Sequence, residues 1–536
     1  MKSMKKLVTL LLSLVMLCAL AMPAMADETY SITINGAVAG HTYTAYQVFS
    51  GVYYKGDRQN NTPAGNEYLS NVDWGKGVDG TAILNKLKTN DTLKTKFENS
   101  TTAEDVAYVL QTMKDKSAEL DEFARVVGHN LKKDTEPSSV TVATGDNTKT
   151  AKIENLAAGY YFVKDSGAIN NGEIATKFLV EVVGNASVTV KADAPTIEKK
   201  IVENGTTVNG TSANVGDKVT FQLTANVPDM ASFDKYTFTI SDTLSNGLTF
   251  DKNSVVVKIG EKELVANTDY MLGDLDTRTN TFTVTFSKDQ LAKYVVHGTG
   301  ATIVVTYEAT LNSNALTTDK ESNKATLKYS NNPDVDGTGT VTTPDVPVYI
   351  YDFDIGVYKY DDTDNKEEQT ADKTKKLESA EFILYKEVTE NEQTRTYYYQ
   401  WDKDAKAVKW VTEKDQATRK TTTAEGKTSF QGIAAGKYFL EETKAPDGYN
   451  KLKTPVKVEI TAGYKTGTGE LIDTNAEKNG ENGQYIKTVE VPNKAGAVLP
   501  STGGIGTTIF YVLGSILALG AAVLLIVKKR MNGQDR

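Results

Sequence analysis

A lysine, a carboxylic acid and an asparagine recur at strand positions where an inward-facing apolar side chain is expected. In FDIGVYK (Phe353 to Lys359), strict alternation puts the lysine on the same face as the apolar residues. The same alternation turns Glu442 inward in YFLEE and Asn493 inward in VEVPN. Burying a charge or a free amide is costly unless the group finds a partner. The three side chains are therefore predicted to meet inside one domain.

A second trio of the same residue types lies earlier in the chain. Lys199 is in phase with the apolar residues of PTIEKKI, Asp242 with those of YTFTISDTL, and Asn323 with those of ESNKATLKY. For any single residue, a lysine that extends its ammonium to solvent, or a surface acid, is the simpler interpretation. Two complete trios favour the buried arrangement.

These residue types together can form an amide crosslink. Desolvation lowers the pKa of a lysine and frees its amine as a nucleophile. Desolvation also raises the pKa of a carboxyl group, which can then polarise the asparagine carbonyl and shuttle protons while ammonia leaves. The predicted products are the isopeptide bonds Lys359–Asn493 and Lys199–Asn323, and the predicted catalytic acids are Glu442 and Asp242.

The segments that must position these residues are predicted to be strands. Runs such as VTFQLTA, TFTVTF and ATIVVTYEATL are rich in Val, Thr and Phe and are separated by Gly, Asn and Asp. This pattern predicts a mainly β fold of tandem immunoglobulin-like antiparallel β-sandwich domains. In the first third of the chain, TAILNKLKTNDTLKTKF and AEDVAYVLQTMKDKSAELDEFARVV have helical periodicity and predict helices inserted into a β domain.

Prolines divide the exported chain into three predicted domains, residues 27–194, 195–347 and 348–495. LAAGYYFVKD near the end of the first resembles IAAGKYFLEE in the third, which predicts a shared fold. The first domain lacks the trio, because its opening strand YSITING has no lysine and Ala192 stands where the third domain has Asn493. We therefore expect no isopeptide bond there.

Both ends of the chain carry targeting signals. Residues 1–26 combine early lysines, an apolar run and Ala24-Met25-Ala26, the pattern of a secretory signal peptide. Residues 506–527 contain no charge and are long enough to cross a bilayer, and the basic tail 528–536 is expected to stay cytoplasmic. The only cysteine is Cys18, so the exported chain cannot form a disulfide.

Charge and motif content exclude several functions. Removing both terminal segments takes away seven basic residues and one acidic residue, and the net charge falls from −9 to −15. No basic stripe remains to neutralise phosphates, which argues against nucleic acid. The chain has no HExxH or GxSxG motif, and His41, His129 and His297 are interpreted as ordinary loop or strand residues. We expect no metal, no cofactor and no enzymatic activity beyond self-crosslinking.

Two motifs identify a family that the chain resembles. Leu499, Pro500, Ser501, Thr502 and Gly503 read LPSTG before the apolar segment and resemble the LPxTG sorting signal. YFLEETKAPDGY (residues 438–449) resembles the E-box YxLxETxAPxGY at every fixed position. The whole chain is thus similar to the backbone subunits, or major pilins, of sortase-assembled pili in Gram-positive bacteria. The resemblance implies Cna B-type first and third domains and a Cna A-like middle domain.

The resemblance also implies partners and a location. A sortase would cut between Thr502 and Gly503 and pass the acyl group to a lysine of the next pilin, or to peptidoglycan. The protein would then be a cell wall-anchored fimbrial subunit that supports adhesion, and its membrane anchor would be transient. The sequence indicates no particular host ligand.

Lys191, in SVTVKADAP, is the predicted acceptor lysine. It lies where the family often carries a YPK-type motif, but Tyr and Pro are absent beside it. Val188 and Val190 set the inward phase, so Lys191 is expected to point outward. A solvated strand lysine is the alternative, and Lys177 and Lys164 are the next candidates. A monomeric wall-anchored adhesin of similar domains would keep the sorting signal and the trios but need no acceptor.

Overall fold

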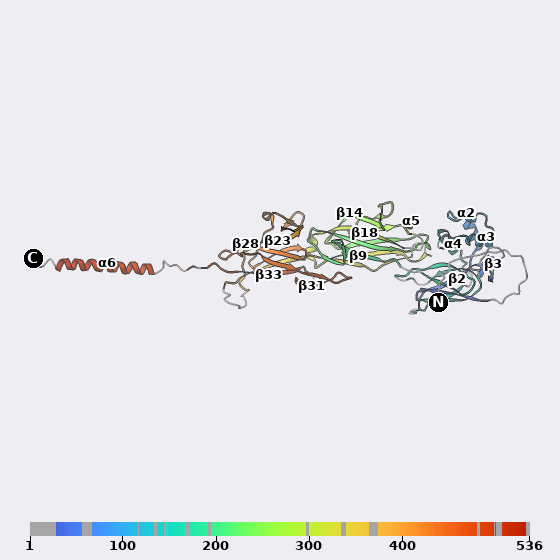
Figure 1. Cartoon of the computed structure of the whole chain (residues 1–536), viewed down its shortest axis with the longest axis horizontal. Coiled ribbons are helices and arrows are strands. Elements are labelled where there is room, and N and C mark those ends of the chain that lie inside the picture. The colour runs from blue at the N-terminus through green and yellow to red at the C-terminus, as the bar shows by residue number, and fades with distance from the viewer. Residues whose placement is uncertain are drawn as a thin grey trace.

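The computed structural model describes residues 28–55, 67–115, 117–132, 137–143, 146, 148–166, 169, 172–190, 194–295, 300–333, 339–363, 373–479, 483–497, 499 and 506–531. Three β-rich bodies lie in a row, followed by the helix α6 (Gly506–Met531) (Figure 1). The predicted mainly β fold with an apolar C-terminal helix is confirmed. The predicted signal peptide lies outside the described residues.

The first sandwich contains strands β1 to β8. One sheet has the order β5-β1-β8, and the other has the order β3-β2-β6-β7 with β4 paired to β2. The strands are β1 (Tyr30–Asn35), β2 (Thr42–Lys55), β3 (Glu67–Trp74), β4 (Ser138–Thr141), β5 (Thr150–Leu156), β6 (Gly159–Asp165), β7 (Lys177–Val182) and β8 (Ala186–Thr189).

The predicted helical insertion is confirmed and lies between β3 and β4. It consists of α1 (Gly80–Thr89), α2 (Lys94–Phe97), α3 (Ala103–Leu110) and α4 (Ala118–His129). Side-chain caps fix the helix starts: Asp79 accepts from the backbone N–H of Ala82, and Thr102 forms a capping box with Asp105. The helices pack on the sheet that contains β2, where the Phe123 ring stacks on both Phe49 and Phe97.

The second sandwich contains strands β9 to β21 in two large sheets. Their orders are β10-β9-β12-β18-β14-β15 and β11-β21-β19-β13-β17-β16, with β20 paired to β19. The elements are β9 (Ile197–Glu203), β10 (Thr206–Val208), β11 (Gly210–Ser212), β12 (Lys218–Val227), β13 (Phe238–Leu244), β14 (Leu248–Ile259), β15 (Lys262–Glu263), β16 (Met271–Leu272), β17 (Thr281–Phe286), α5 (Lys288–Ala292), β18 (Ala301–Leu311), η1 (Ser313–Thr317), β19 (Glu321–Ser330), β20 (Thr340–Thr342) and β21 (Val346–Tyr351).

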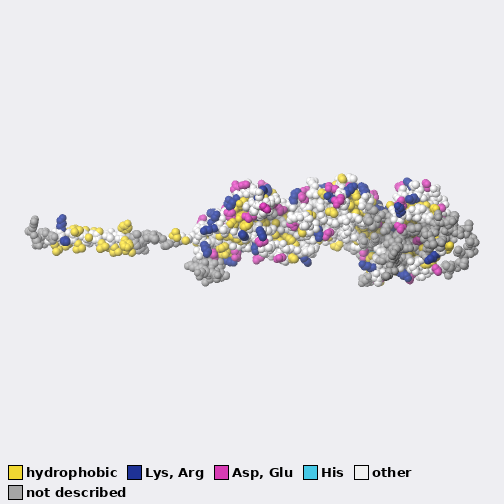
Figure 2. Space-filling view, in the orientation of Figure 1, with side chains coloured by type: hydrophobic (Ala, Val, Ile, Leu, Met, Phe, Trp, Pro, Cys, Tyr) yellow, Lys and Arg dark blue, Asp and Glu magenta, His cyan; other side chains and the backbone are white. Residues whose placement is uncertain are grey.

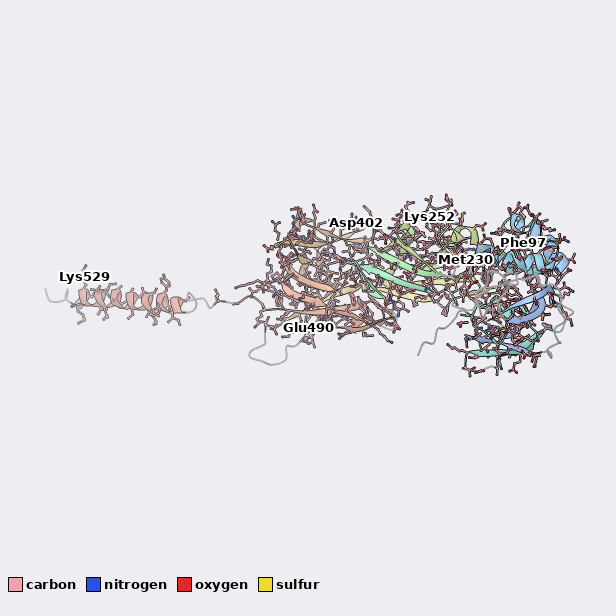
Figure 3. All side chains as sticks on the ribbon, turned by 45° about the vertical axis from the view of Figure 1, so that its right-hand side comes forward. Phe97, Met230, Lys252, Asp402, Glu490 and Lys529 are labelled. Carbon is pink, nitrogen blue, oxygen red and sulfur yellow. The ribbon has the colours of Figure 1, made fainter. Side chains whose placement is uncertain are left out.

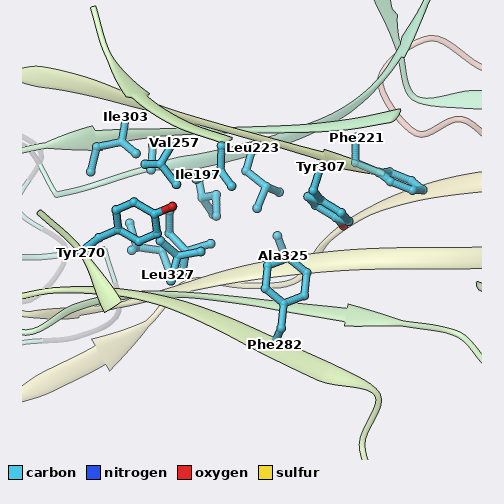
Figure 4. Close-up of a cluster of buried hydrophobic side chains, with 14 of the residues drawn as sticks. Ile197, Phe221, Leu223, Val257, Tyr270, Phe282, Ile303, Tyr307, Ala325 and Leu327 are labelled. Atoms are coloured by element: carbon cyan, nitrogen blue, oxygen red, sulfur yellow. The ribbon is translucent and has the colours of Figure 1, made fainter. Parts of the chain in front are cut away.

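Alternating burial in the second sandwich produces its core. Along β12 and β18 every second side chain is buried, so each strand presents one apolar face to the opposite sheet. Figure 4 shows these inward side chains filling the space between the two sheets.

The third sandwich contains strands β22 to β33. Its sheets have the orders β27-β22-β33-β32 and β25-β24-β23-β28-β29, with β26 paired to β23 and a separate β30-β31 pair. The elements are β22 (Phe353–Asp361), β23 (Glu381–Glu390), β24 (Gln393–Asp402), β25 (Ala407–Val411), η3 (Lys414–Gln416), β26 (Lys420–Thr421), β27 (Lys427–Ile433), β28 (Gly436–Lys444), β29 (Val456–Ile460), β30 (Ala462–Tyr464), β31 (Leu471–Thr474), β32 (Glu477–Lys478) and β33 (Tyr485–Asn493).

The second and third sandwiches are closely connected. Strand β21 pairs with β19 and ends at Tyr351, and β22 begins at Phe353, so a single residue separates two sheets of different sandwiches. Across the junction, Ala434 and Ala435 donate backbone hydrogen bonds to Asn214 and Ser212. Figure 3 marks the resulting row with Phe97 in the first sandwich, Met230 in the second and Glu490 in the third.

The surface of the sandwiches differs in character from that of α6. Acidic and basic side chains are interspersed over the visible face of the sandwiches, whereas α6 is covered mainly by apolar side chains (Figure 2). An 18-residue stretch within Thr508–Met531 has a mean hydropathy of 2.6, and none of that stretch is buried. By length and composition this helix can cross a membrane.

Candidate functional site

The predicted trio of the third sandwich meets in its core. Lys359 comes from β22, Asn493 from β33 and Glu442 from β28, and each is at most 2 % exposed. Lys359 Nζ donates to Asn493 Oδ1 at 2.5 Å and to the backbone oxygen of Val491 at 3.1 Å. Asn493 Nδ2 donates to Glu442 Oε1 at 3.0 Å, and this oxygen lies 3.5 Å from Lys359 Nζ. The acid therefore contacts both the lysine amine and the amide nitrogen of the asparagine.

Strand register explains how the lysine and the asparagine come together. Strands β22 and β33 are parallel neighbours, and Lys359 is paired with Val491, two residues before Asn493. The two side chains thus project from the same face of one sheet, toward Glu442 on the facing sheet. The second carboxylate oxygen of Glu442 accepts the backbone N–H of Leu452 at 2.7 Å, which holds the acid in place.

Burial favours the neutral form of the amine in this site. Desolvation lowers the pKa of Lys359 to about 8, and the nearby Glu442 opposes this shift. Roughly a tenth of such an amine is neutral at pH 7, far more than for a lysine of ordinary pKa. The arrangement can therefore supply a nucleophile, an electrophilic amide and a proton carrier within hydrogen-bonding distance.

The trio of the second sandwich is also buried, but its strands are arranged differently. Lys199 on β9 forms a buried ion pair with Asp242 on β13, in the facing sheet. Asn323 lies on β19, which is the neighbour of β13. Here the acid and the amide share a sheet and the lysine faces them. Asn323 does not lie on the last strand of this sandwich, because β20 and β21 follow β19.

Burial also shifts the protonation of this second site. Desolvation lowers the pKa of Lys199 and raises the pKa of Asp242, in both cases against the attraction between the two groups. Both shifts favour the neutral pair, an amine and a carboxylic acid, over the ion pair.

Sequence reasoning missed a fourth member of this site, Tyr307 on β18. Its hydroxyl accepts from Lys199 Nζ at 2.9 Å and from Asn323 Nδ2 at 2.6 Å, and it donates to Asp242 Oδ1 at 2.8 Å. Tyr307 lies on the inward face of ATIVVTYEATL, where strand alternation by itself predicts only a packing role. The available signal was its hydroxyl, since a buried tyrosine usually finds a hydrogen-bond partner.

The sorting signal and the acceptor lysine are mostly beyond the described part of the chain. Leu499 is described and is 82 % exposed. Pro500, Ser501, Thr502 and Gly503 lie outside the described residues, and so does Lys191. Val190, the last described residue before Lys191, directly follows β8.

The first sandwich holds a different buried cluster at the position matching Glu442. Asp165, at the end of β6, pairs with His41 Nδ1 at 2.8 Å, and His41 Nε2 lies 3.2 Å from Glu173 Oε2. His41 lies in the loop before β2, and its side chain is fully buried. The hydrogen bond with Asp165 is the largest cause that raises the pKa of His41.

The His41 cluster predicts a pH-dependent stability of the first sandwich. Because its folded-state pKa lies above the unfolded value of 6.5, protonated His41 stabilises the fold fully below that value, and this stabilisation is lost as the pH rises through the raised pKa. The melting temperature of this sandwich should therefore fall as the pH rises from about 6.5 through the raised pKa of His41. Calorimetry of His41→Gln should show a smaller change of melting temperature with pH than the wild type. His129→Gln, which alters an exposed histidine, is the control and should behave like the wild type. If the melting temperature of His41→Gln changes with pH as in the wild type, His41 is not the group that causes the pH dependence.

Three family models match the chain. Residues 215–333 match the Gram-positive pilin backbone subunit 2, Cna-B-like domain; residues 358–475 match the SpaA prealbumin-like fold domain; and residues 491–533 match the LPXTG cell wall anchor motif. The first description differs from the expected Cna A-like character of the middle domain.

Individual relatives agree with these models. The trypsin-resistant surface T6 protein of Streptococcus pyogenes is 24% identical over 418 residues, which are 65% of this chain and 71% of that protein. Fimbrial subunit type 1 of Actinomyces viscosus is 32% identical over 95 residues, 18% of this chain and 15% of that subunit. The solved T6 backbone pilin of S. pyogenes has the same fold, with a TM-score of 0.51 and 19% identity over 88% of this chain and all of that one. The matched domains, the anchor motif and the similarity to the T6 protein together support a Gram-positive pilus backbone protein that is anchored at the cell wall surface.

Proposed function

We propose that this pilin is polymerised and wall-anchored by a sortase, and that two intramolecular Lys–Asn isopeptide bonds stabilise each subunit. The observation that carries the proposal is the pair of buried clusters, each holding a lysine, an acid and an asparagine in a sandwich core. The protein is a structural subunit whose chemistry is a single self-crosslinking event in each site, and the resulting fibre supports adhesion. A monomeric wall-anchored adhesin is the alternative.

The third site supports a direct route to the bond. The neutral Lys359 amine attacks the carbonyl carbon of Asn493, whose oxygen it already contacts. Glu442 takes a proton from the attacking nitrogen and returns one to Asn493 Nδ2, so the carbon–nitrogen bond breaks and ammonia leaves. The product amide carries no charge, which removes the cost of a buried ammonium.

The position of the proposed bond suits a fibre under tension. The chain enters the third sandwich along β22 and leaves it at the end of β33 toward the sorting signal. A bond between Lys359 and Asn493, which are 134 positions apart, would carry force directly from one strand to the other. The intervening residues would then be outside the load path, and tension could not unfold them.

Each proposed bond should remove one ammonia from the chain. We expect the processed protein, residues 27–502, to be lighter than its sequence mass by two losses of ~17 Da each, because amide exchange releases NH₃. Intact-mass spectrometry measures the total, and peptide mapping assigns Lys199–Asn323 and Lys359–Asn493. Lys200→Ala, which alters the half-exposed neighbour of Lys199, should keep both losses, whereas Lys199→Ala should keep one. An unshifted wild-type mass would overturn the proposal.

A further inference from the structure

The Tyr307 hydroxyl is the least expected group in the core of the second sandwich. Its ring stacks on Phe221 at 5.3 Å and meets the edges of Phe250 and Phe282 at 5.5 and 4.9 Å. Phenylalanine could fill this space equally well. Burying a hydroxyl among aromatic rings costs free energy unless the hydroxyl is fully hydrogen-bonded. The hydroxyl is therefore explained by its partners rather than by packing.

Those partners are the three groups that must exchange protons during crosslinking. A tyrosine hydroxyl has one proton to donate and can accept hydrogen bonds on its oxygen. Here it receives bonds from Lys199 and Asn323 and gives its proton to Asp242. Figure 4 shows Tyr307 projecting from its sheet toward the facing strand that carries Ala325, two residues beyond Asn323. The hydroxyl thus touches the attacking nitrogen, the acid and the leaving nitrogen.

The asparagine is oriented so that this contact falls on its leaving group. Tyr307 binds Asn323 Nδ2, while Asn323 Oδ1 is buried without a hydrogen-bond partner among the described residues. The third site differs, because Lys359 contacts the asparagine oxygen directly and Glu442 contacts the asparagine nitrogen. In the second site, among the hydrogen bonds between described residues, Asp242 reaches the asparagine only through Tyr307.

We infer that Tyr307 is a catalytic residue of the second crosslinking site and relays the proton that releases ammonia. This inference rests on the proposed isopeptide function. Asp242 first takes a proton from the Lys199 ammonium. The amine then attacks the Asn323 carbonyl carbon, and the new carbon–nitrogen bond leaves two hydrogens on Nζ and a negative charge on the oxygen.

Tyr307 next completes the exchange. Its hydroxyl passes its proton to Asn323 Nδ2 and recovers one from Nζ, the old carbon–nitrogen bond breaks as the carbonyl re-forms, and ammonia departs. The tyrosine ends as it began, Lys199 and Asn323 are joined by an amide, and the proton on Asp242 leaves with ammonia as ammonium. No oxidant, metal or other reactant is needed for this balance.

The test measures the rate at which each crosslink forms in the Tyr307→Phe variant. Processed chains are synthesised in a cell-free system, quenched in acid at intervals and analysed by intact mass and peptide mapping. We expect the Lys199–Asn323 bond to form on the order of 100-fold more slowly, because a positioned proton donor and acceptor has been removed. The Lys359–Asn493 bond should form at the wild-type rate and serves as the internal control.

A matched variant and a second probe separate chemistry from folding. Tyr236→Phe removes another buried hydroxyl of the same sandwich, one without a hydrogen-bond partner in the described structure, and should leave both rates unchanged. If Tyr307→Phe fails to fold, 3-fluorotyrosine at position 307 keeps the hydroxyl but makes it more acidic. This change should shift the pH dependence of the rate at which the Lys199–Asn323 bond forms, and leave that of the Lys359–Asn493 bond unchanged. A wild-type rate in Tyr307→Phe, or an unshifted pH profile with fluorotyrosine, overturns the relay. Absence of the bond in the wild-type chain would instead reject the proposed function.

Discussion

Glu442→Ala is expected to leave the third sandwich folded but without its Lys359–Asn493 bond. The acid activates the two partners without joining them, so its removal stops proton transfer while the lysine and the asparagine remain hydrogen-bonded. Losing a crosslink that closes so long a loop should lower the free energy of unfolding by about 4–5 kcal/mol in the chain-entropy model. Intact mass should show one ammonia loss in place of two, and calorimetry should show earlier melting of this sandwich.

Glu441→Ala is the matched control for that variant. Glu441 is the residue directly before Glu442 on β28, but it points to the opposite face, where it pairs with Lys414 at the surface. Surface ion pairs contribute little to stability, so this change should keep both ammonia losses and shift melting only slightly. If Glu442→Ala retains both losses, the acid is not the proton carrier. For the second sandwich, the corresponding change is Asp242→Ala.

Strand alternation was sufficient to predict the members of both trios, because side-chain direction in a strand depends only on the local period of two. All six side chains are buried, as the phase of their strands predicts. Alternation carries no information about which strands are neighbours. It therefore could not show that Lys359 and Asn493 lie on adjacent strands, whereas Lys199 and Asn323 face each other across the core.

Whether neighbouring strands run parallel or antiparallel could not be predicted from the sequence either. Most pairs are antiparallel as predicted, but β1 and β8, β11 and β21, and β22 and β33 are parallel. A strand shows the same alternation whichever way its neighbour runs, so only the three-dimensional connections decide this. The parallel pairing of β22 and β33 is what brings the start and the end of the third sandwich together.

Tyr307 and His41 show why the remaining groups could not be predicted. An inward tyrosine is an ordinary core residue, and its role becomes visible only when its partners are placed around it. His41 lies just before β2, outside any periodic pattern, and its partners are 124 and 132 positions away. Contacts between residues this distant in sequence depend on the whole fold.

Lys191→Arg is expected to abolish the covalent polymer. A sortase acyl group on Thr502 needs a neutral amine as acceptor, and a guanidinium remains protonated and is a poor nucleophile. Wall extracts should lose their ladder of high-mass species on denaturing gels, while single subunits still reach the wall through LPSTG. Lys177→Arg and Lys164→Arg, which alter paired positions on β7 and β6, are the controls and should polymerise normally.

The load path along the fibre supports Lys191 over these two lysines. Lys191 follows the last strand of the first sandwich and precedes β9, and the sorting signal follows the last strand of the third. Head-to-tail linkage between these points gives an open filament. Tension would pass from Lys191 to Lys199, through the two isopeptide bonds, and on to Thr502, leaving the first sandwich unloaded. At the position of the proposed acid Glu442, the first sandwich has Asp165, which is paired with His41. The two proposed bonds therefore lie in the two sandwiches that a Lys191 acceptor would place under tension. A ladder that persists in Lys191→Arg and disappears in Lys177→Arg would put the first sandwich under load and exclude this path.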